Sequence, residues 1–304
     1  MKLHRLLIYL LIASSLMMIT ACGGDRGGSI GYGEVAMSIT DANPLLPDGA
    51  GNVTNLWITF TDVLVHKSGG GWISLPLAGD SPYVIDLLQF YNGKITEIVP
   101  SVLLEYGKYT QVRIIIESAT IRFDDDPTTD SPVIIPPGHL KTDKNFILDV
   151  DKPESADIII DFDLSQSLVV TDPFGKPSYK LNPVLHIVRA TEAATIKGEI
   201  AQGSFIVGQN AEVTVFIPNS GIQGGYKEYT KIEVSESDTG PTKFSIYWLV
   251  PDQDYRVEIK FDPEFGNGID FSEDLSANNL EPGIVWNLSG GTPIRNRRLV
   301  LISS

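Results

Sequence analysis

The sequence predicts an all-β protein made of two sandwich-like domains. Many short segments alternate apolar and polar residues with a period of two, which is typical of strands with one buried face. Clusters of Gly, Pro, Asn and Asp separate these segments at roughly 8 to 12 residue intervals. No amphipathic helical pattern extends beyond about two turns. Because a single sheet would leave one apolar face in water, each set of strands needs a second sheet to cover it.

The first half of the chain contains the clearest strand signals. Residues 55–66 alternate large apolar side chains with Trp and Thr, and the Gly-rich turn at residues 68–71 leads into residues 72–75, which predicts a hairpin. Residues 109–117 form the strongest predicted strand, and residues 102–105 are predicted to form a single helical turn. Further strands are expected at residues 34–40, 83–90, 133–135, 146–150, 157–164 and 180–189.

The alternating pattern starts anew after residues 189–193, which places a domain boundary there. An N-terminal β-sandwich is therefore predicted over residues 33–190 and a second sandwich over residues 194–304. Residues 229–239 are interpreted as a polar stretch between strands. Strands of the second domain are expected at residues 195–200, 211–217, 244–250, 254–261, 284–288 and 298–302.

The first 21 residues have the pattern of a secretory signal. A basic start that includes Lys2 and Arg5 precedes an apolar run over residues 6–18, and Ala21 stands before Cys22, the single cysteine of the chain. The apolar run is too short for a transmembrane helix. We therefore expect cleavage of residues 1–21.

This arrangement resembles the bacterial lipoprotein signal, which ends in a small residue followed by Cys. The resemblance implies that Cys22 becomes the new N-terminus and carries diacylglycerol and an amide-linked acyl chain such as palmitate. Residues 22–32 would then be the lipidated Cys and a flexible, Gly-rich tether. Two acyl chains are sufficient for stable membrane anchoring. Gly23, where inner-membrane lipoproteins carry Asp, favours the outer membrane. The alternative is an ordinary secretory signal with an unrelated cysteine.

Charge and cysteine content exclude several classes of function. The chain has 38 acidic and 23 basic side chains and a net charge of −15. An acidic surface repels nucleic acids, so no nucleic-acid partner is expected. If Cys22 carries lipid, no thiol is left for a disulfide, a nucleophile or a metal site. The acidity suits an envelope protein or one that binds cations.

The sharpest local motif is the acidic stretch after residue 123. Asp124, Asp126, Thr128 and Asp130 alternate, which would direct several oxygen atoms to one hard cation. Ca²⁺ binds six to eight oxygen ligands, so we expect a calcium site here. The stretch is not an EF-hand, because Thr129 stands where that loop needs Gly. The alternative is a solvated hairpin tip.

Aromatic side chains suggest a second candidate site. Trp72 follows the Gly-rich turn, and an exposed aromatic ring at a turn is a platform on which a sugar ring can stack. We therefore consider Trp72 a candidate ligand-binding residue. The alternative is that it packs in the core or against a cross-strand neighbour.

Paired carboxylates suggest a catalytic alternative. Asp161 and Asp163 stand two residues apart in the predicted strand 157–164, so period two places them on one strand face. Two carboxylates about 5 to 9.5 Å apart across a cleft can hydrolyse glycosidic bonds. The alternative is an outward polar face. The histidines outside the signal show no metal-ligand spacing and are interpreted as structural: His66, His139 and His186.

The first domain resembles a bacterial lipoprotein family defined by a domain of unknown function, number 4382. The similarity extends over roughly residues 31–165, and these motifs are strand and turn signatures. The family has no established activity, so the resemblance implies fold and cellular location. The segments that carry it are residues 33–42, 63–66, 71–72, 84–88, 92–93 and 107–113.

The second domain resembles the transthyretin-like sandwich of carboxypeptidase-regulatory modules. The similarity rests on Gly198 and Ile200, the strand at residues 213–217 and the segment at residues 251–257, although Gln253 and its neighbour replace the usual small residues. Such modules usually serve as spacers or adhesive units.

Together these observations predict a lipid-anchored protein of the bacterial cell envelope with a non-catalytic binding, adhesion or structural role. Its expected partners are the membrane, through Cys22, and an envelope protein or glycan. The alternative is an envelope hydrolase that acts on glycans with Asp161 and Asp163. No cofactor other than Ca²⁺ is expected.

Overall fold

A computed structural model describes most of the chain after the predicted tether. Tyr32–Ser304 forms one compact unit. The predictions for Cys22, His139 and the strand at residues 298–302 lie outside the described residues. The described residues are 31–41, 53–136, 140–141, 146–148, 155–171, 178–200, 202, 204–205, 210–219, 221, 225–251, 253–261, 271–275 and 285–287.

The N-terminal half, residues 32–189, contains thirteen strands and two short helices among its described residues. They are β1 (Tyr32–Thr40), β2 (Val53–Lys67), β3 (Trp72–Leu75), β4 (Tyr83–Asp86), the 3₁₀ helix η1 (Leu87–Gln89), β5 (Thr96–Glu105), β6 (Gly107–Phe123), β7 (Asp130–Ile134), β8 (Leu140–Lys141), β9 (Phe146–Leu148), β10 (Ala156–Phe162), α2 (Leu164–Ser167), β11 (Leu168–Thr171), β12 (Ser178–Leu181) and β13 (Leu185–Arg189).

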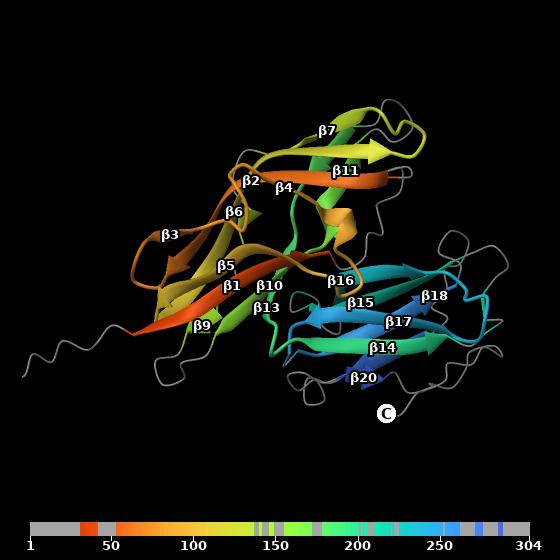
Figure 1. Cartoon of the computed structure of the whole chain (residues 1–304). Helices are drawn as coiled ribbons and strands as arrows, with labels where there is room; N and C mark the ends of the chain where they lie inside the picture. Colours follow the sequence, from red (N-terminus) through yellow and green to blue (C-terminus); the bar gives the residue numbers. More distant parts are fainter. Residues whose placement is uncertain are drawn as a thin grey trace, which may run out of the picture. The chain divides into compact units, whose positions relative to one another are not determined.

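Strand β1 lies inside a four-stranded sheet with the order β13-β10-β1-β5 (Figure 1). It pairs in parallel with β10 and antiparallel with β5. Val35, Met37 and Ile39 are buried, which follows from period two along the strand. Because β1 and β10 are parallel, their C-terminal ends lie side by side at the same end of the sheet. Polar residues follow both strands there.

The second sheet of this half has nine strands, with β2 and β6 paired along most of their length. Its longest path has the order β11-β12-β7-β6-β2-β3. The predicted alternation of Leu56, Ile58 and Phe60 is confirmed, because all three side chains are buried. One hydrophobic core contains residues from both sheets. Each sheet therefore covers the apolar face of the other.

Four predictions for local structure are wrong. The strand predicted over residues 83–90 ends at Asp86, and residues 87–89 form η1. The strand predicted over residues 180–189 is divided between β12 and β13, which belong to different sheets. Residues 102–105 belong to β5, where Val102 pairs with Val35 of β1, so sheet pairing overrides a helical tendency. Residues 229–234, interpreted as a polar stretch, belong to a strand in which Tyr229 and Ile232 are buried.

The C-terminal half, residues 194–287, forms two smaller sheets with their own hydrophobic core. The first has the order β17-β14-β20, and the second has the order β16-β15-β18-β19 (Figure 1). Its described strands are β14 (Ala194–Ile200), β15 (Ala211–Asn219), β16 (Gly225–Val234), β17 (Thr242–Leu249), β18 (Tyr255–Lys260), β19 (Phe271–Leu275) and β20 (Val285–Asn287).

The all-β, sandwich-like fold class is thereby confirmed. The pairings among the described strands join no strand of one half to a strand of the other. The exact domain limits at residues 190 and 194 stay a prediction. Within the part of the chain that the structure covers, no helix has both the length and the apolar character needed to cross a membrane.

Candidate functional site

Three buried aspartates gather where β1 and β10 end, and we call this group the acidic seam. Asp41 follows β1, Asp161 lies near the end of β10, and Asp163 follows it. Because the two strands are parallel, with Thr40 beside Asp161, their carboxyl ends meet at the same edge. The residues Asp41, Asp161 and Asp163 are only 1%, 3% and 1% exposed.

Two of these carboxylates cap the short helix α2. Asp163 accepts hydrogen bonds from the Ser165 hydroxyl at 2.6 Å and from the Gln166 backbone N–H and side-chain amide at 3.2 and 2.7 Å. Asp41 accepts one from the Leu164 N–H at 3.2 Å. These bonds satisfy donors that a helix start leaves without partners. The prediction that Asp161 and Asp163 share one strand is wrong, because β10 ends at Phe162, before Asp163. The alternative of an outward polar face is also wrong, because both side chains are buried.

The acidic seam also contacts the C-terminal half. The Gln166 side-chain amide donates to the backbone oxygen of Tyr229 in β16, at 2.6 Å. The His186 ring stacks on the Tyr229 ring, with centroids 4.1 Å apart, and His186 Nε2 lies 3.9 Å from Asp163 Oδ2. Tyr229 also meets the Tyr255 ring edge to face at 5.5 Å. A polar and aromatic contact therefore joins the two halves.

Burial changes the protonation of these groups. It raises the pKa of Asp161 well above its ordinary value, and the charges of Asp163 and Asp41 raise it further. Burial also raises the pKa of Asp163, although the hydrogen bonds from Ser165 and Gln166 oppose this effect. Asp161 Oδ1 is buried and has no hydrogen-bond partner among the described residues. A neutral, protonated Asp161 is the form that this environment favours.

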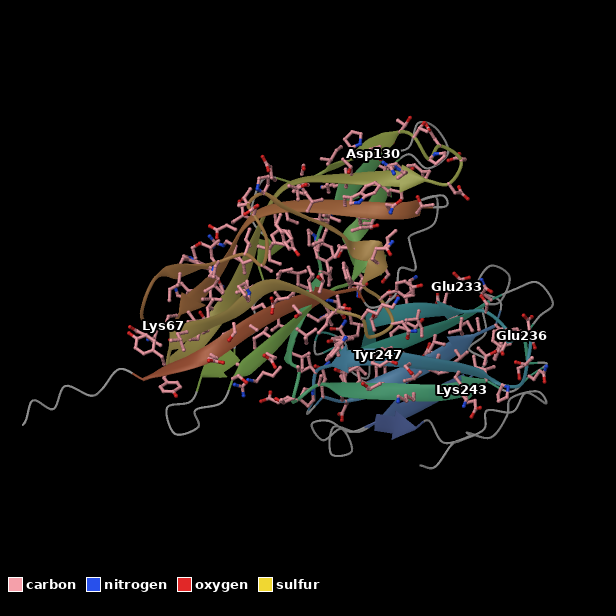
Figure 2. The ribbon with its side chains drawn as sticks, in the orientation of Figure 1. Lys67, Asp130, Glu233, Glu236, Lys243 and Tyr247 are labelled. Carbon is pink, nitrogen blue, oxygen red and sulfur yellow. The ribbon has the colours of Figure 1, made fainter. Side chains whose placement is uncertain are left out.

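The predicted calcium ligands Asp124, Asp126 and Thr128 lie in the exposed turn between β6 and β7, and the fourth, Asp130, is the exposed first residue of β7 (Figure 2). Asp130 accepts a hydrogen bond from Arg122 Nε at 2.8 Å, and Asp126 accepts one from the Thr128 hydroxyl at 3.1 Å. Hydrogen bonds from Thr129 and Thr128 lower the pKa of Asp126. Neither this turn nor any other group of three or more His, Cys, Asp or Glu side chains among the described residues is arranged so that it could hold a metal ion. Calcium binding at this turn stays a prediction.

We expect millimolar Ca²⁺ to raise the melting temperature by a few degrees if this turn binds the ion, because a ligand of the folded state stabilises it. The measurement is a thermal melt with and without Ca²⁺. The double variant Asp124→Ala, Asp126→Ala should lose the shift, whereas Asp80→Ala, in another exposed turn, should keep it. An unchanged melting temperature in the unaltered protein would remove the calcium proposal.

Trp72 is half-buried in a cross-strand cluster. It pairs with His66 between β3 and β2, and the two rings meet edge to face at 5.2 Å. The Arg113 guanidinium carbon lies 3.8 Å from the Trp72 ring centroid, a cation–π contact that covers one ring face. His66 Nδ1 lies 2.9 Å from the Thr110 hydroxyl. Sugar stacking on Trp72 stays a prediction. The Arg113 contact counts against it, because that contact covers one face of the Trp72 ring.

Sequence reasoning missed a cavity beside the turn that follows η1. Its volume is about 240 Å³, and Tyr91 and Asn92 line it together with residues of β16 and β17. The dipeptide Asn92-Gly93 signals a tight turn, and both residues have a positive φ. That signal identifies the turn, but the strands opposite it belong to the other half of the chain.

Comparison with known proteins places this all-β, sandwich-like chain in a family. Residues 32–183 match the model of DUF4382, a domain of unknown function. The match extends over half of the chain, which therefore belongs to this family. The resemblance inferred from the strand and turn motifs is confirmed, whereas that of the C-terminal half to carboxypeptidase-regulatory modules stays a prediction. No curated protein sequence matches the chain.

Solved structures show remote similarity. The fimbrial anchor protein Mfa2 from Porphyromonas gingivalis has 11% identity and a TM-score of 0.20, over 80% of this chain and 82% of Mfa2. A fimbrial assembly protein from Parabacteroides distasonis has 10% identity and a TM-score of 0.19, over 89% and 95%. The tip fimbrial protein Mfa3 from Porphyromonas gingivalis has 9% identity and a TM-score of 0.18, over 90% and 99%. These values do not support an argument about function.

Proposed function

We propose that this chain is a lipid-anchored protein of the bacterial cell envelope with a non-catalytic binding or structural role. One observation carries the proposal: the polar side chains best suited to chemistry are engaged in holding the fold together. Asp163 and Asp41 cap α2, and Gln166 of that helix bonds to Tyr229 of the C-terminal half. The acidic seam thus acts as a joint between the two halves, which suits a spacer or a binding module.

The proposed anchor is the lipid on Cys22, followed by the Gly-rich tether of residues 22–32. Outer-membrane placement is favoured by Gly23. A carboxypeptidase-regulatory-like C-terminal half, which would act as a spacer or adhesive unit, fits the same role. An envelope protein or glycan is the proposed partner.

Burial supports this role over the alternative of a glycan hydrolase. A hydrolase needs its two carboxylates on opposite sides of a cleft that admits the substrate. Asp161 and Asp163 are 3% and 1% exposed, and Asp163 is the helix cap. A glycan would have to displace the contact between His186 and Tyr229 to reach the Asp163 carboxylate from that side.

The anchor is tested by changing its attachment point. We expect Cys22→Ala in the full chain to abolish labelling by radioactive palmitate in the bacterial host and to move the protein from the membrane fraction to the soluble fraction, since the acyl chains supply the anchoring energy. Ser29→Ala, in the same tether, is the matched control and should remain labelled and membrane-bound. Membrane retention of unlabelled Cys22→Ala would refute lipid anchoring.

A further inference from the structure

The cavity beside the turn after η1 has walls from both halves of the chain. Tyr91 and Asn92 form one wall. The other is formed by residues 232–234 of β16, by Ser235, which follows that strand, and by residues 242–245 of β17. Figure 2 labels Glu233 and Lys243, the two charged side chains that line it. The two charges have opposite sign, so they offer little net attraction for an ion. The site suits a neutral ligand that accepts and donates hydrogen bonds.

The turn that carries Tyr91 is fixed in place. The Thr40 hydroxyl donates to the Lys94 backbone oxygen at 2.7 Å, and the Asp41 N–H donates to the Phe90 oxygen at 2.7 Å. The Lys94 N–H closes the turn on the Tyr91 oxygen at 3.1 Å. Residues at the end of β1 therefore hold both ends of the turn, and this wall of the cavity is preformed.

Gly93 seats the turn against the C-terminal half. Its φ is +82°, a backbone conformation that residues other than glycine rarely adopt. A Cβ at this position would lie 3.2 Å from the ring of Tyr247 in β17 (Figure 2). The turn thus lies against the Tyr247 ring, next to residues 242–245 of β17, which line the cavity.

Two outer strands line the cavity. Among the described strands, β16 is at one edge of its sheet and β17 is at one edge of the other, and residues of both line the same space. Outer strands carry N–H and C=O groups that no neighbouring strand of the sheet binds. Ser235 and Ser245 contribute hydroxyl groups beside them. Tyr91, which is 38% exposed, also lines the cavity, and Lys94 Nζ lies 5.5 Å from the centroid of its ring.

We propose that this cavity binds a single neutral pyranose ring, such as the terminal sugar of an envelope glycan. A pyranose has an apolar C–H face suited to the Tyr91 ring and a circle of hydroxyls suited to Asn92, the serines, Glu233 and Lys243. This inference rests on the proposed binding role and specifies its ligand class. It places the site away from Trp72.

Size and access favour a sugar over a peptide strand. The cavity volume of about 240 Å³ is below the roughly 300 Å³ at which pockets for drug-sized ligands begin, so it accepts one ring. A peptide added along β17 needs a continuous open edge. The turn at Gly93 lies against the Tyr247 side chain of β17, so an added peptide strand would meet the turn there.

The test is saturation-transfer NMR and calorimetric titration of the chain from residue 23 onward with methyl glycosides of neutral hexoses and N-acetylhexosamines. We expect saturable binding by at least one glycoside and at least tenfold weaker binding to Tyr91→Ala and to Lys243→Ala. Tyr32→Ala, which removes an exposed tyrosine elsewhere, and Lys108→Ala, which removes an exposed lysine of β6, should bind normally. Thermal melts of all variants would verify that they are folded.

The proposal is overturned if no neutral glycoside binds, or if binding is equal in Tyr91→Ala, Lys243→Ala and the controls. Binding of extended peptides with new protection of β17 amides, and no effect of glycosides, would instead identify strand addition. Palmitate labelling of the full chain is measured in parallel. A labelled, membrane-bound chain that binds no glycoside leaves the anchoring role intact, whereas glycoside binding by an unlabelled chain refutes the anchor alone.

Discussion

Replacing Tyr229 with alanine is expected to lower the free energy of unfolding by about 3–5 kcal/mol, the usual effect of deleting a large buried aromatic ring. Tyr229 is only 3% exposed. The variant loses the stacking on His186 and the edge contact with Tyr255 and leaves a cavity between them. Because Tyr229 and His186 belong to different halves, we also expect the halves to unfold in two separate transitions.

Urea denaturation followed by both fluorescence and circular dichroism measures this effect. Tyr226→Ala is the matched control on the same strand, since the Tyr226 ring contacts Arg256, 3.9 Å from its centroid, and not the acidic seam. It should cost about 1 kcal/mol and keep the original cooperativity. Equal losses in the two variants would show that the Tyr229 contact does not join the halves.

Asp161→Asn is expected to make the protein more stable at neutral and alkaline pH and to flatten its pH dependence. Burial raises the pKa of Asp161 in the folded state, whereas an unfolded Asp titrates near pH 3.9. The folded state therefore binds more protons, and stability falls as the pH increases. This contribution is complete below about pH 4 and is lost as the pH rises through the folded pKa. Asparagine cannot ionise, so the variant avoids this loss.

Melting temperatures between pH 4 and pH 9 test this prediction. Each unit of pKa difference is equivalent to about 1.4 kcal/mol, which is several degrees in a protein of this size. Asp41, Asp163, His186, Tyr229 and Tyr255 surround the same space and remain in the variant, so part of the pH dependence should persist. The matched control, Asp157→Asn on the exposed side of β10, should keep the full slope. If melting temperature depends on pH as steeply in Asp161→Asn as in the unaltered protein, a group other than Asp161 causes the pH dependence.

Much of the fold could be predicted from local pattern, because the alternation in β2 and β6 reflects one buried face. β16 was missed for a physical reason. It is an outer strand with one face toward solvent, so its sequence is rich in charged residues: Lys227, Glu228, Lys231 and Glu233. Residues 102–105 have a helix-like sequence, yet pairing with β1 decides their structure. Local patterns do not report such long-range partners.

The site was predictable only in part. The spacing of Asp161 and Asp163 marked them as a pair, but their burial depends on β1 and on Tyr229, which are distant in sequence. Asp163 followed three residues later by Gln166 has the form of a helix cap, a signal that would have removed it from the strand. Asp41 carries no comparable signal, because its partner Leu164 is brought near by tertiary structure.

The parallel pairing of β1 with β10 determines the order in which β1 gains its two neighbouring strands during folding. A chain that emerges from its N-terminus presents β1 first, and β5 supplies one neighbour about sixty residues later. The other side of β1 waits until residue 156 and beyond have emerged. During that interval the apolar strand has one open edge, the condition in which chains aggregate or recruit chaperones. Closure over so long a sequence separation is slow, so we expect nascent chains that end before β10 to be held by a chaperone until the partner strand arrives.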